Sequence, residues 1–394
     1  MQLEKIETVK PFYYHGNPKM VFGAGRIGDL LNLLPNGGPL FIVSSRHFST
    51  SEAWKSVEAG LRKAGILYIH ETVSGEPSPE VVDELTLMAQ GIRAQALVSI
   101  GGGSVMDAGK AVSAMLREQG SVFHYLEGVG TRKLSGAAVP FIAAPTTAGT
   151  GSEAARNAVL SRRGANGFKK SLRHDALIPR IALIDPELAL GTSPEVTLAC
   201  GMDALCQLLE PLLSTEASPF TNALSWAGLA HFHRGSQLFD EHSLLRKQEL
   251  SLRAELALAA YCSGIALTNA GLGTVHGLAG PLGAACDVPH GVACGLLLAP
   301  VLRRLQHNLN DSEPHKRVAR ILQAAGCALC PDAGASGAAA LIEKIESWAS
   351  RLPRLASWGL KPDALERVVH VSDNKNFPLL LSADERRACL EETL

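Results

Sequence analysis

The sequence predicts an α/β domain built around a parallel sheet, followed by a domain made only of helices. In the first half of the chain, short apolar runs alternate with segments of helical periodicity, which is the pattern of parallel strands joined by crossover helices. After about Asp185 the strand-like runs stop, and long segments of helical periodicity follow. We therefore expect an α/β domain over residues 1–187 and an all-helical domain over residues 188–394.

Five runs in the first half are expected to form buried strands, because they are short, apolar and rich in β-formers. They are residues 19–23 (KMVFG), 39–44 (PLFIVS), 96–101 (ALVSIG), 139–145 (VPFIAAP) and 181–185 (IALID). Helices are expected between them over residues 51–64, 79–94 and 104–118.

The second half is expected to be helical throughout. Helical periodicity predicts helices over residues 194–213, 222–239, 245–267 and 291–305, and a mostly helical remainder from residue 315 to residue 394. Proline and glycine interrupt that remainder, at Pro331, Gly334, Gly337 and Pro353.

Composition excludes several classes of protein. Hydrophobic residues make up 46% and charged residues 19% of the chain, so it can build a core, and disorder is excluded. The formal net charge is −1, whereas a nucleic-acid-binding protein would show clustered basic residues. The longest apolar stretches, such as residues 295–302, are too short to cross a membrane.

Cysteines and the N-terminus predict a cytoplasmic location. Of eight cysteines, only Cys327 and Cys330 form a CxxC pair, and no second pair or nearby histidine completes a zinc site. Reduced thiols of this kind are typical of cytoplasmic proteins. The first twenty residues carry charges where a signal peptide would need an apolar run.

Two glycine motifs compete for a dinucleotide. The first, GAGRIG at residues 23–28, has the GxGxxG spacing, but the next strand ends in Ser44, Ser45 and Arg46 without the acid that binds a ribose. The second, GGGSVMDAGK at residues 101–110, follows a strand and opens a helix, where backbone N–H groups favour a phosphate. We expect Ser104 to cap that helix and Asp107 to order the loop.

A further loop follows the next strand. It reads PTTAGTGSEA at residues 145–154 and is crowded with small hydroxyl residues that can hydrogen-bond a pyrophosphate or a carboxamide. Either loop alone would be an ordinary strand-to-helix turn. The two together, at successive strand ends of one sheet, favour a nucleotide site.

The helical half carries a candidate metal site. Asp203, His276 and His290 each have a structural explanation alone, since a buried histidine is usually a hydrogen-bonded core residue. One carboxylate and two imidazoles in glycine-flanked, apolar contexts together suit Zn²⁺ or Fe²⁺.

At this point the chain resembles a known family. GGGSVMDAGK, PTTAGTGSE, DPELALGTSPEVTLACGMDAL and GLGTVHGLAGPLGAACDVPHG, with SDNKNFPLLLSADE near the end, are similar to the successive signatures of the iron-containing (group III) alcohol dehydrogenases. The resemblance spans essentially the whole chain in the same order. It implies the fold of those enzymes and of dehydroquinate synthase, and it also implies a homodimer or a larger homo-oligomer.

The resemblance also implies roles for individual residues. Gly102, Gly103, Ser104 and Asp107 match the family's pyrophosphate loop, Thr146, Thr147 and Thr150 match its second cofactor loop, and Lys169 matches a lysine that commonly contacts the cofactor. Asp203, His276 and His290 match three of the four metal ligands, and we expect them to form the catalytic centre.

The chain departs from the family at two positions. The fourth ligand, a histidine four residues after the aspartate, is replaced by Gln207, which still shares a helix face with Asp203 and is a weaker, neutral ligand. Glycerol dehydrogenases of the same superfamily use one aspartate and two histidines, so a three-ligand site and a metal-free site both stay open. Four residues after His276, where the family often has a proton-relaying histidine, the chain has Gly280.

The resemblance implies hydride transfer between NAD(P) and a small alcohol or aldehyde, with Fe²⁺ or Zn²⁺ as a Lewis acid. Ser45 followed by Arg46, at the end of the second strand, favours NADP over NAD. The alternatives are a metal-independent reductase, a catalytically silent relative, and a lyase of the dehydroquinate synthase type. No nucleic acid or membrane partner is expected.

Overall fold

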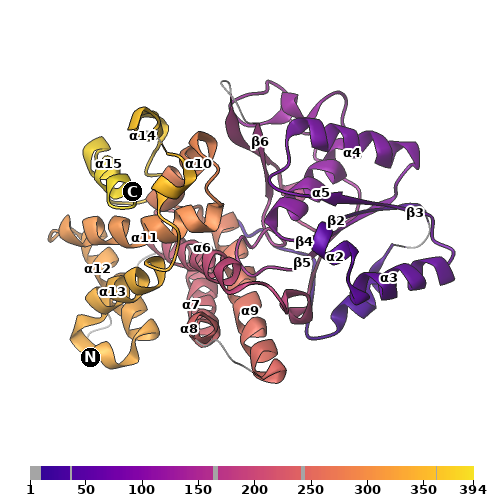
Figure 1. Cartoon of the computed structure of the whole chain (residues 1–394). Coiled ribbons are helices and arrows are strands. Elements are labelled where there is room, and N and C mark those ends of the chain that lie inside the picture. Colours follow the sequence, from indigo (N-terminus) through magenta and orange to yellow (C-terminus); the bar gives the residue numbers. More distant parts are fainter. Residues whose placement is uncertain (1–9, 36–37, 163–166, 241–244, 361) are drawn as a thin grey trace.

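The computed structural model describes residues 10–35, 38–162, 167–240, 245–360 and 362–394. Residues 1–9, on which the expectation of no signal peptide partly rests, lie outside this range. Figure 1 shows one lobe that holds the sheet and its helices and a second lobe that holds helix α6 and the helices after it. The predicted fold class is confirmed, while the domain division at residue 187 stays a prediction.

A six-stranded parallel sheet forms the first lobe, in the order β1-β8-β5-β4-β2-β3. Its strands are β1 (Lys19–Phe22), β2 (Leu40–Ser45), β3 (Tyr68–Val73), β4 (Ala96–Gly101), β5 (Phe141–Pro145) and β8 (Ile181–Ile184). All five predicted strands are present. Strand β3 was missed because it lies at an edge and carries His70 and Glu71, so it lacks a continuous apolar run.

Helices cover both faces of the sheet because its central strands are apolar on both sides. In β2, Leu40 and Ile42 face the core beneath α3 (Glu52–Lys63), while Phe41 and Val43 face the core beneath α4 (Pro79–Gly91) and α5 (Gly103–Met115). This alternation follows from the two-residue period of a strand. The short helices α1 (Leu30–Leu33) and α2 (Arg46–Ser49) complete this lobe.

An antiparallel hairpin, β6 (Asn157–Arg162) and β7 (Phe168–Arg173), leaves the main sheet. The sequence did not reveal it, because β7 is mostly polar and the few buried apolar residues of the hairpin, Ala158, Leu160 and Leu172, form no continuous apolar run. A hydrogen bond from the backbone N–H of Val159 to Asp107 Oδ2, 3.0 Å long, attaches the hairpin to α5.

The second lobe is helical, as expected. Its helices are α6 (Pro194–Leu213), α7 (Pro219–Gly235), α8 (Gln237–Asp240), α9 (Arg246–Ala270), α10 (Thr274–Ala285), α11 (His290–His307), α12 (Glu313–Leu329), α13 (Gly337–Ala349), α14 (Pro362–Val371) and α15 (Ala383–Glu391). The helix predicted over residues 222–239 is interrupted near Ser236. Helix α10 was missed because its many glycines hide the helical periodicity.

Helix α6 runs through the centre of the helical lobe. Leu205, Leu208, Leu209 and Leu212 belong to one large core that also takes in α10, α11 and α13. By length and composition α6 and α9 could each cross a membrane, but 89% of the apolar stretch of α6 and 50% of that of α9 are buried inside the protein. These helices are therefore explained by packing within the lobe.

A buried carboxyl makes the stability of the fold depend on pH. Glu153 is 3% exposed, and its burial raises the pKa to about 7, against the opposing effects of a backbone hydrogen bond and of Lys110. Between the unfolded pKa near 4.5 and this value, the folded protein keeps a proton that the unfolded chain releases. Raising the pH through this window therefore lowers the free energy of unfolding.

We predict that Glu153→Gln removes this pH dependence. Thermal denaturation should show wild type and variant with similar stability near pH 5 and the variant more stable near pH 8, by on the order of 1–3 kcal/mol. A stability difference that does not change between these two pH values would contradict the prediction.

Candidate functional site

The two glycine-containing loops meet at the carboxyl edge of the sheet. Strand β4 ends at Gly101, which pairs with Pro145 at the end of β5, and the backbone N–H of Thr146 donates to the carbonyl of Gly101 at 2.9 Å. In the strand order β1-β8-β5-β4-β2-β3, the chain passes from β2 to its neighbour β3 at one edge of the sheet. From β4 it passes to β5, toward the other edge, so the direction of the strand order reverses between β2 and β4. Parallel sheets bind ligands at the carboxyl ends beside such a reversal.

Glycine is required where these loops touch. A Cβ atom at Gly103 would lie 2.7 Å from Thr150 Cγ2, and one at Gly102 would lie 3.4 Å from Thr147 Oγ1. A side chain at Gly103 would therefore force the loops apart. The structure thus brings Gly102, Gly103, Thr147 and Thr150 together, as the sequence predicted.

The first turn of α5 keeps its backbone donors free of a side-chain cap. Helices α3, α4 and α6 begin at Ser51, Ser78 and Ser193, whose hydroxyls accept N–H groups of the first turn. The N-cap of α5 is Gly102, which has no side chain, and no side-chain cap is present within the described residues. The expectation that Ser104 caps α5 is wrong, because Ser104 is already inside the helix. An uncapped N-terminus offers N–H groups to an anion.

The other glycine motif already holds an internal anion. In GAGRIG the N–H groups of Gly25 and Ile27 donate to the two carboxylate oxygens of Asp185, at 3.1 and 2.8 Å. Because these donors bind Asp185, the loop serves to join β1 to β8. This contact favours the loop at residues 101–110 for the dinucleotide.

Asp107 joins the two candidate cofactor loops. Its Oδ1 accepts the hydroxyl of Ser152 at 2.6 Å, and the buried Nζ of Lys110 lies 3.6 Å from the same oxygen. Lys110 in turn donates to the carbonyl of Asn157 at 2.6 Å. Asp107 therefore orders the loop at residues 145–154, whereas its expected role in ordering the loop of its own helix stays a prediction.

The two remaining predicted cofactor residues lie on β2 and β7. Ser45 ends β2, and its hydroxyl accepts the N–H of Phe48 to cap α2. Lys169 on β7 forms an ion pair with Glu76, and its Nζ lies 3.2 Å from the position of a Cβ atom at Gly283 on α10. Lys169 therefore lies between the hairpin and the helical lobe.

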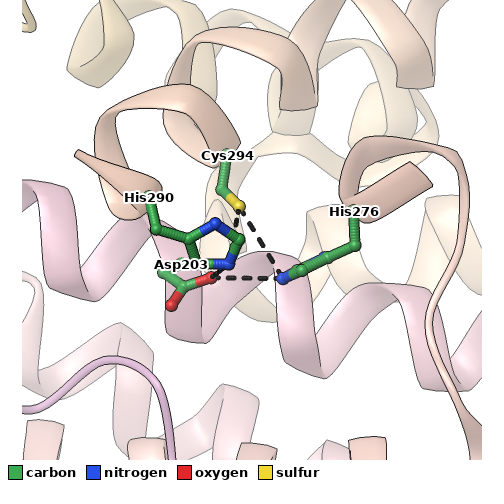
Figure 2. A group of neighbouring side chains, drawn as sticks. All are labelled: Asp203, His276, His290 and Cys294. Carbon is green, nitrogen blue, oxygen red and sulfur yellow. Dashed lines mark hydrogen bonds and ion pairs between the residues drawn. The ribbon is translucent and has the colours of Figure 1, made fainter. Parts of the chain in front are cut away.

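Three helices bring the predicted metal ligands together (Figure 2). Asp203 comes from α6, His276 from α10 and His290 from the first position of α11. Asp203 Oδ1 lies 3.3 Å from Nε2 of His276 and 3.7 Å from Nε2 of His290. Two histidines that lie 73 and 87 positions after Asp203 in the sequence thus converge on one of its oxygens.

Cys294 belongs to the same group and was missed. Its Sγ lies 3.7 Å from Nε2 of His276 and 3.7 Å from Nε2 of His290. The four potential ligand atoms lie within 4.8 Å of one another. The spacing of His290 and Cys294, four residues apart at the start of a helix, is the signal that could have revealed it.

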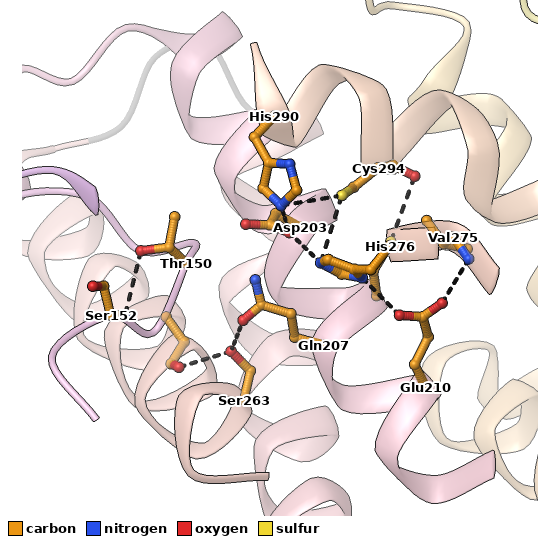
Figure 3. A network of polar contacts seen from close by, with 12 residues as sticks. Thr150, Ser152, Asp203, Gln207, Glu210, Ser263, Val275, His276, His290 and Cys294 are labelled. Atoms are coloured by element: carbon orange, nitrogen blue, oxygen red, sulfur yellow. Dashed lines mark hydrogen bonds and ion pairs between the residues drawn. The ribbon is translucent and has the colours of Figure 1, made fainter. Parts of the chain in front are cut away.

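Gln207 lies one turn after Asp203 on the same face of α6, as the spacing predicted (Figure 3). Its Oε1 accepts the hydroxyl of Ser263 at 3.1 Å, and its side chain also hydrogen-bonds to Asp203. Gln207 is therefore engaged with Ser263 and with the carboxylate. These contacts favour a positioning role, and its predicted role as a ligand stays a prediction.

Glu210, the second residue that sequence reasoning missed, fixes the orientation of His276. Its Oε2 lies 2.6 Å from Nδ1 of His276, and its Oε1 accepts the N–H of Val275 at 2.8 Å (Figure 3). With its proton on Nδ1, the imidazole presents the lone pair of Nε2 to the cluster. Asp203, Gln207 and Glu210 share one face of α6, a pattern visible in the sequence.

The electrostatics of the cluster suit a cation. Burial acts to raise the pKa of Asp203, but His290, His276 and the Gln207 amide together lower it to about 2. Burial lowers the pKa of His290 to about 4. Burial acts to lower the pKa of His276, but Cys294, Glu210 and Asp203 raise it well above its usual value. At neutral pH Asp203 and His290 are therefore in the forms that bind a divalent metal, whereas His276 would release a proton when a metal binds.

The residues present fit a divalent metal ion. Asp203 is 1% exposed, and its Oδ1 has no hydrogen-bond partner among the described residues. A buried charged oxygen without a partner is costly, and a cation between this oxygen and the two Nε2 atoms would satisfy it. Beside the cluster, a Cβ atom at Gly280 would meet nothing within 4 Å, so the missing histidine leaves open space.

The second loop joins the cofactor region to the metal cluster. A Cβ atom at Gly149 would lie 2.9 Å from Cβ of Cys200, one turn before Asp203 on α6. A Cβ atom at Gly151 would lie 2.4 Å from Cα of Gly264, which follows the Ser263 that holds Gln207. The loop at residues 145–154 therefore packs directly on the helices of the cluster.

Comparison with known proteins agrees with this architecture. Residues 17–186 match the iron-containing alcohol dehydrogenases, and residues 197–378 match the C-terminal domain of the Fe-containing alcohol dehydrogenase family. The chain is 29% identical to a 1-propanol dehydrogenase of Citrobacter freundii over 92% of this chain and 97% of that one. It is 32% identical to a lactaldehyde reductase of Escherichia coli over 76% and 77% of the two chains.

A solved structure agrees as well. The fold is similar to that of a 1,3-propanediol oxidoreductase, with a TM-score of 0.81 and 26% identity over 98% of this chain and 100% of that one. The family matches cover most of the described α/β lobe and helical lobe in order. The chain belongs to the iron-containing alcohol dehydrogenase family and is an oxidoreductase that acts on CH–OH groups.

Proposed function

We propose that the protein transfers a hydride between NAD(P) and a small alcohol or aldehyde, with a divalent metal ion held by Asp203, His276 and His290. One observation carries the proposal. The unpartnered Oδ1 of Asp203 faces the Nε2 atoms of both histidines, one turn along α6 from the contact with the loop at residues 145–154.

The residues of the α/β lobe are suited to hold the dinucleotide. Gly102, Gly103 and Ser104 would offer the backbone N–H groups of the uncapped α5 to the pyrophosphate. Hydroxyls of Thr146, Thr147 and Thr150 line the adjoining loop, which Asp107 holds in place through Ser152. Lys169, between the hairpin and α10, would approach the cofactor from the other side.

The chemistry divides between the bound groups and the chain. The nicotinamide would donate or accept the hydride, and the metal ion would polarise the carbonyl oxygen of the substrate. The chain would orient these groups: Glu210 directs Nε2 of His276, Gln207 positions Asp203, and the surrounding apolar core excludes water. Without a histidine at position 280, proton transfer would use water or a cofactor hydroxyl.

The named relatives suggest the size of the substrate. They act, by their names, on 1-propanol, lactaldehyde and 1,3-propanediol, and the open space at Gly280 leaves room for a substrate of this size or larger. A homo-oligomer in the cytoplasm remains our proposal for the assembly and location.

Removing the metal or Asp203 should abolish turnover. We predict that metal-stripped protein and Asp203→Asn lose roughly 10²–10³-fold or more of the rate of NADPH oxidation with short aldehydes, and that adding Fe²⁺ or Zn²⁺ restores only the wild type. Binding of NADPH, followed by its fluorescence, should stay within a factor of a few.

Two outcomes would contradict this assignment. Full turnover by metal-free wild type would identify a metal-independent reductase. NADPH binding without turnover of any aldehyde in a broad panel, at full metal content, would identify a catalytically silent relative.

Glu210→Gln should weaken metal binding. A glutamine can still accept the N–H of Val275, but its amide would donate to Nδ1 of His276 and move the imidazole proton to Nε2. We expect metal affinity to fall about 10–100-fold, measured by competition with a chelator.

A matched pair elsewhere provides the control. Glu255 lies 2.7 Å from Nδ1 of His231 on the α7–α9 contact, so Glu255→Gln disturbs the same kind of hydrogen bond away from the cluster. Equal losses of metal affinity in the two variants would show that Glu210 acts on general stability and not on His276.

Cofactor preference should depend on Ser45. The position ends β2 beside the reversal of strand order, and Arg46 next to it is exposed, which supports NADP through its 2′-phosphate. Ser45→Asp keeps a residue that can cap α2 and adds a carboxylate for ribose hydroxyls. We expect the ratio of kcat/KM for NADH over NADPH to rise at least about tenfold. An unchanged ratio would show that the 2′ position of the adenosine ribose does not lie near Ser45.

A further inference from the structure

We propose that Cys294 is the fourth protein ligand of the metal and that the resulting oxygen, nitrogen, nitrogen and sulfur site selects Zn²⁺ over Fe²⁺. The inference rests on the proposed function in taking the cluster at Asp203 as the metal site. The family pattern does not predict it, because there the fourth ligand lies four residues after the aspartate, on α6.

The distances give four of the six edges between the four ligand atoms, and the other two, Oδ1 to Sγ and Nε2 to Nε2, are at most 4.8 Å. Asp203 Oδ1 lies 3.3 and 3.7 Å from the two Nε2 atoms, and Cys294 Sγ lies 3.7 Å from each of them. A zinc ion bonded tetrahedrally at about 2.0–2.3 Å separates its ligand atoms by about 3.3–3.6 Å. The four atoms therefore surround a space of the size that Zn²⁺ occupies (Figure 2).

Helix α11 supplies two of these ligands. His290 and Cys294 stand one turn apart at its start, so both side chains project from one face toward α6 and α10 (Figure 2). Gln207, at the family's fourth position, is held by Ser263. The site has thus lost a nitrogen from α6 and gained a sulfur from α11.

The neighbouring thiol of Cys206 contacts Cys294 and not the two histidines. Cys206 is buried like Cys294, but its Sγ donates to the backbone carbonyl of Cys294 at 3.5 Å. Cys206 therefore contacts Cys294 through both its backbone carbonyl and its thiol, and it is not one of the four clustered ligand residues. It is a matched control with the same chemistry and the same burial.

Sulfur changes which metal the site prefers. Thiolate is a soft ligand that favours Zn²⁺ over Fe²⁺. A site of oxygen and nitrogen ligands alone discriminates less between these two metals. On binding, the S–H bond of Cys294 breaks, the sulfur bonds to the metal, and the proton leaves to solvent. A carboxylate and a thiolate then balance the charge of a divalent ion, and a substrate oxygen would add as a fifth ligand.

Cobalt spectroscopy tests the ligand directly. We would titrate metal-free full-length protein with Co²⁺ under anaerobic conditions and record the spectra of wild type, Cys294→Ser, Cys294→His and Cys206→Ala. Wild type and Cys206→Ala should show the near-ultraviolet band of sulfur-to-cobalt charge transfer together with visible tetrahedral bands. Cys294→His should keep the visible bands and lose the charge-transfer band.

Metal competition provides the second readout. Wild type should prefer Zn²⁺ over Fe²⁺ by at least about 10²-fold, and Cys294→Ser should lose most of that preference, while Cys206→Ala keeps it. Circular dichroism and NADPH binding verify that each variant is folded, and Cys294→His provides a second substitution if the serine variant is unstable.

The outcomes separate this inference from the proposed function. Visible cobalt bands without charge transfer in the wild type would overturn the role of Cys294 and leave the metal-assisted reductase intact. A charge-transfer band without turnover of any aldehyde would support the ligand and overturn the proposed activity. No stoichiometric cobalt at all would overturn both.

Discussion

The buried carboxylate of Asp203 is the constraint on which the helical lobe depends. A carboxylate that is 1% exposed in an apolar core costs several kcal/mol unless opposite charge and hydrogen bonds compensate for it. Helices α10 and α11 meet α6 where His276 and His290 approach this group, and Gln207 hydrogen-bonds to it. Oδ1 has no hydrogen bond among the described residues and only the approach of the two Nε2 atoms, and a cation between them would satisfy it.

The same helix face connects the metal cluster to the sheet. Gly149 and Gly151 have no side chain because their loop lies against Cys200 on α6 and Gly264 on α9. Since that loop also contacts Gly102 and Gly103 through its threonines, a ligand at the N-terminus of α5 would lie on the loop that touches the metal helix. Direct backbone packing of the loop at residues 145–154 therefore connects the cofactor loops to the metal cluster.

Sequence reasoning was sufficient where a pattern is local. Apolar runs located five of the strands, and the motif order located Asp203, His276 and His290, which the structure brings together. It failed where the sequence signal is weak or where a contact depends on how separate helices pack. The polar strands β3 and β7 lack an apolar run, α10 is hidden by glycines, and Gly102, not Ser104, is the N-cap of α5.

The residues that were missed, Glu210 and Cys294, show the same limit. Glu210 falls on the face of α6 defined by Asp203 and Gln207, but nothing in the sequence says that His276 from another helix meets it. Cys294 reads as one of several buried thiols until α10 places an imidazole beside it. Family patterns direct attention to the lost histidine, whereas only the structure reveals what stands in its place.

The most direct test of the account is anomalous X-ray diffraction at the zinc edge, from crystals of the zinc-loaded protein. The account predicts one strong anomalous peak between Asp203 Oδ1, the Nε2 atoms of His276 and His290, and Cys294 Sγ. A peak elsewhere, such as at Cys327 and Cys330, would contradict the account. The absence of a peak at the cluster, in protein shown to contain one zinc ion per chain, would contradict it as well.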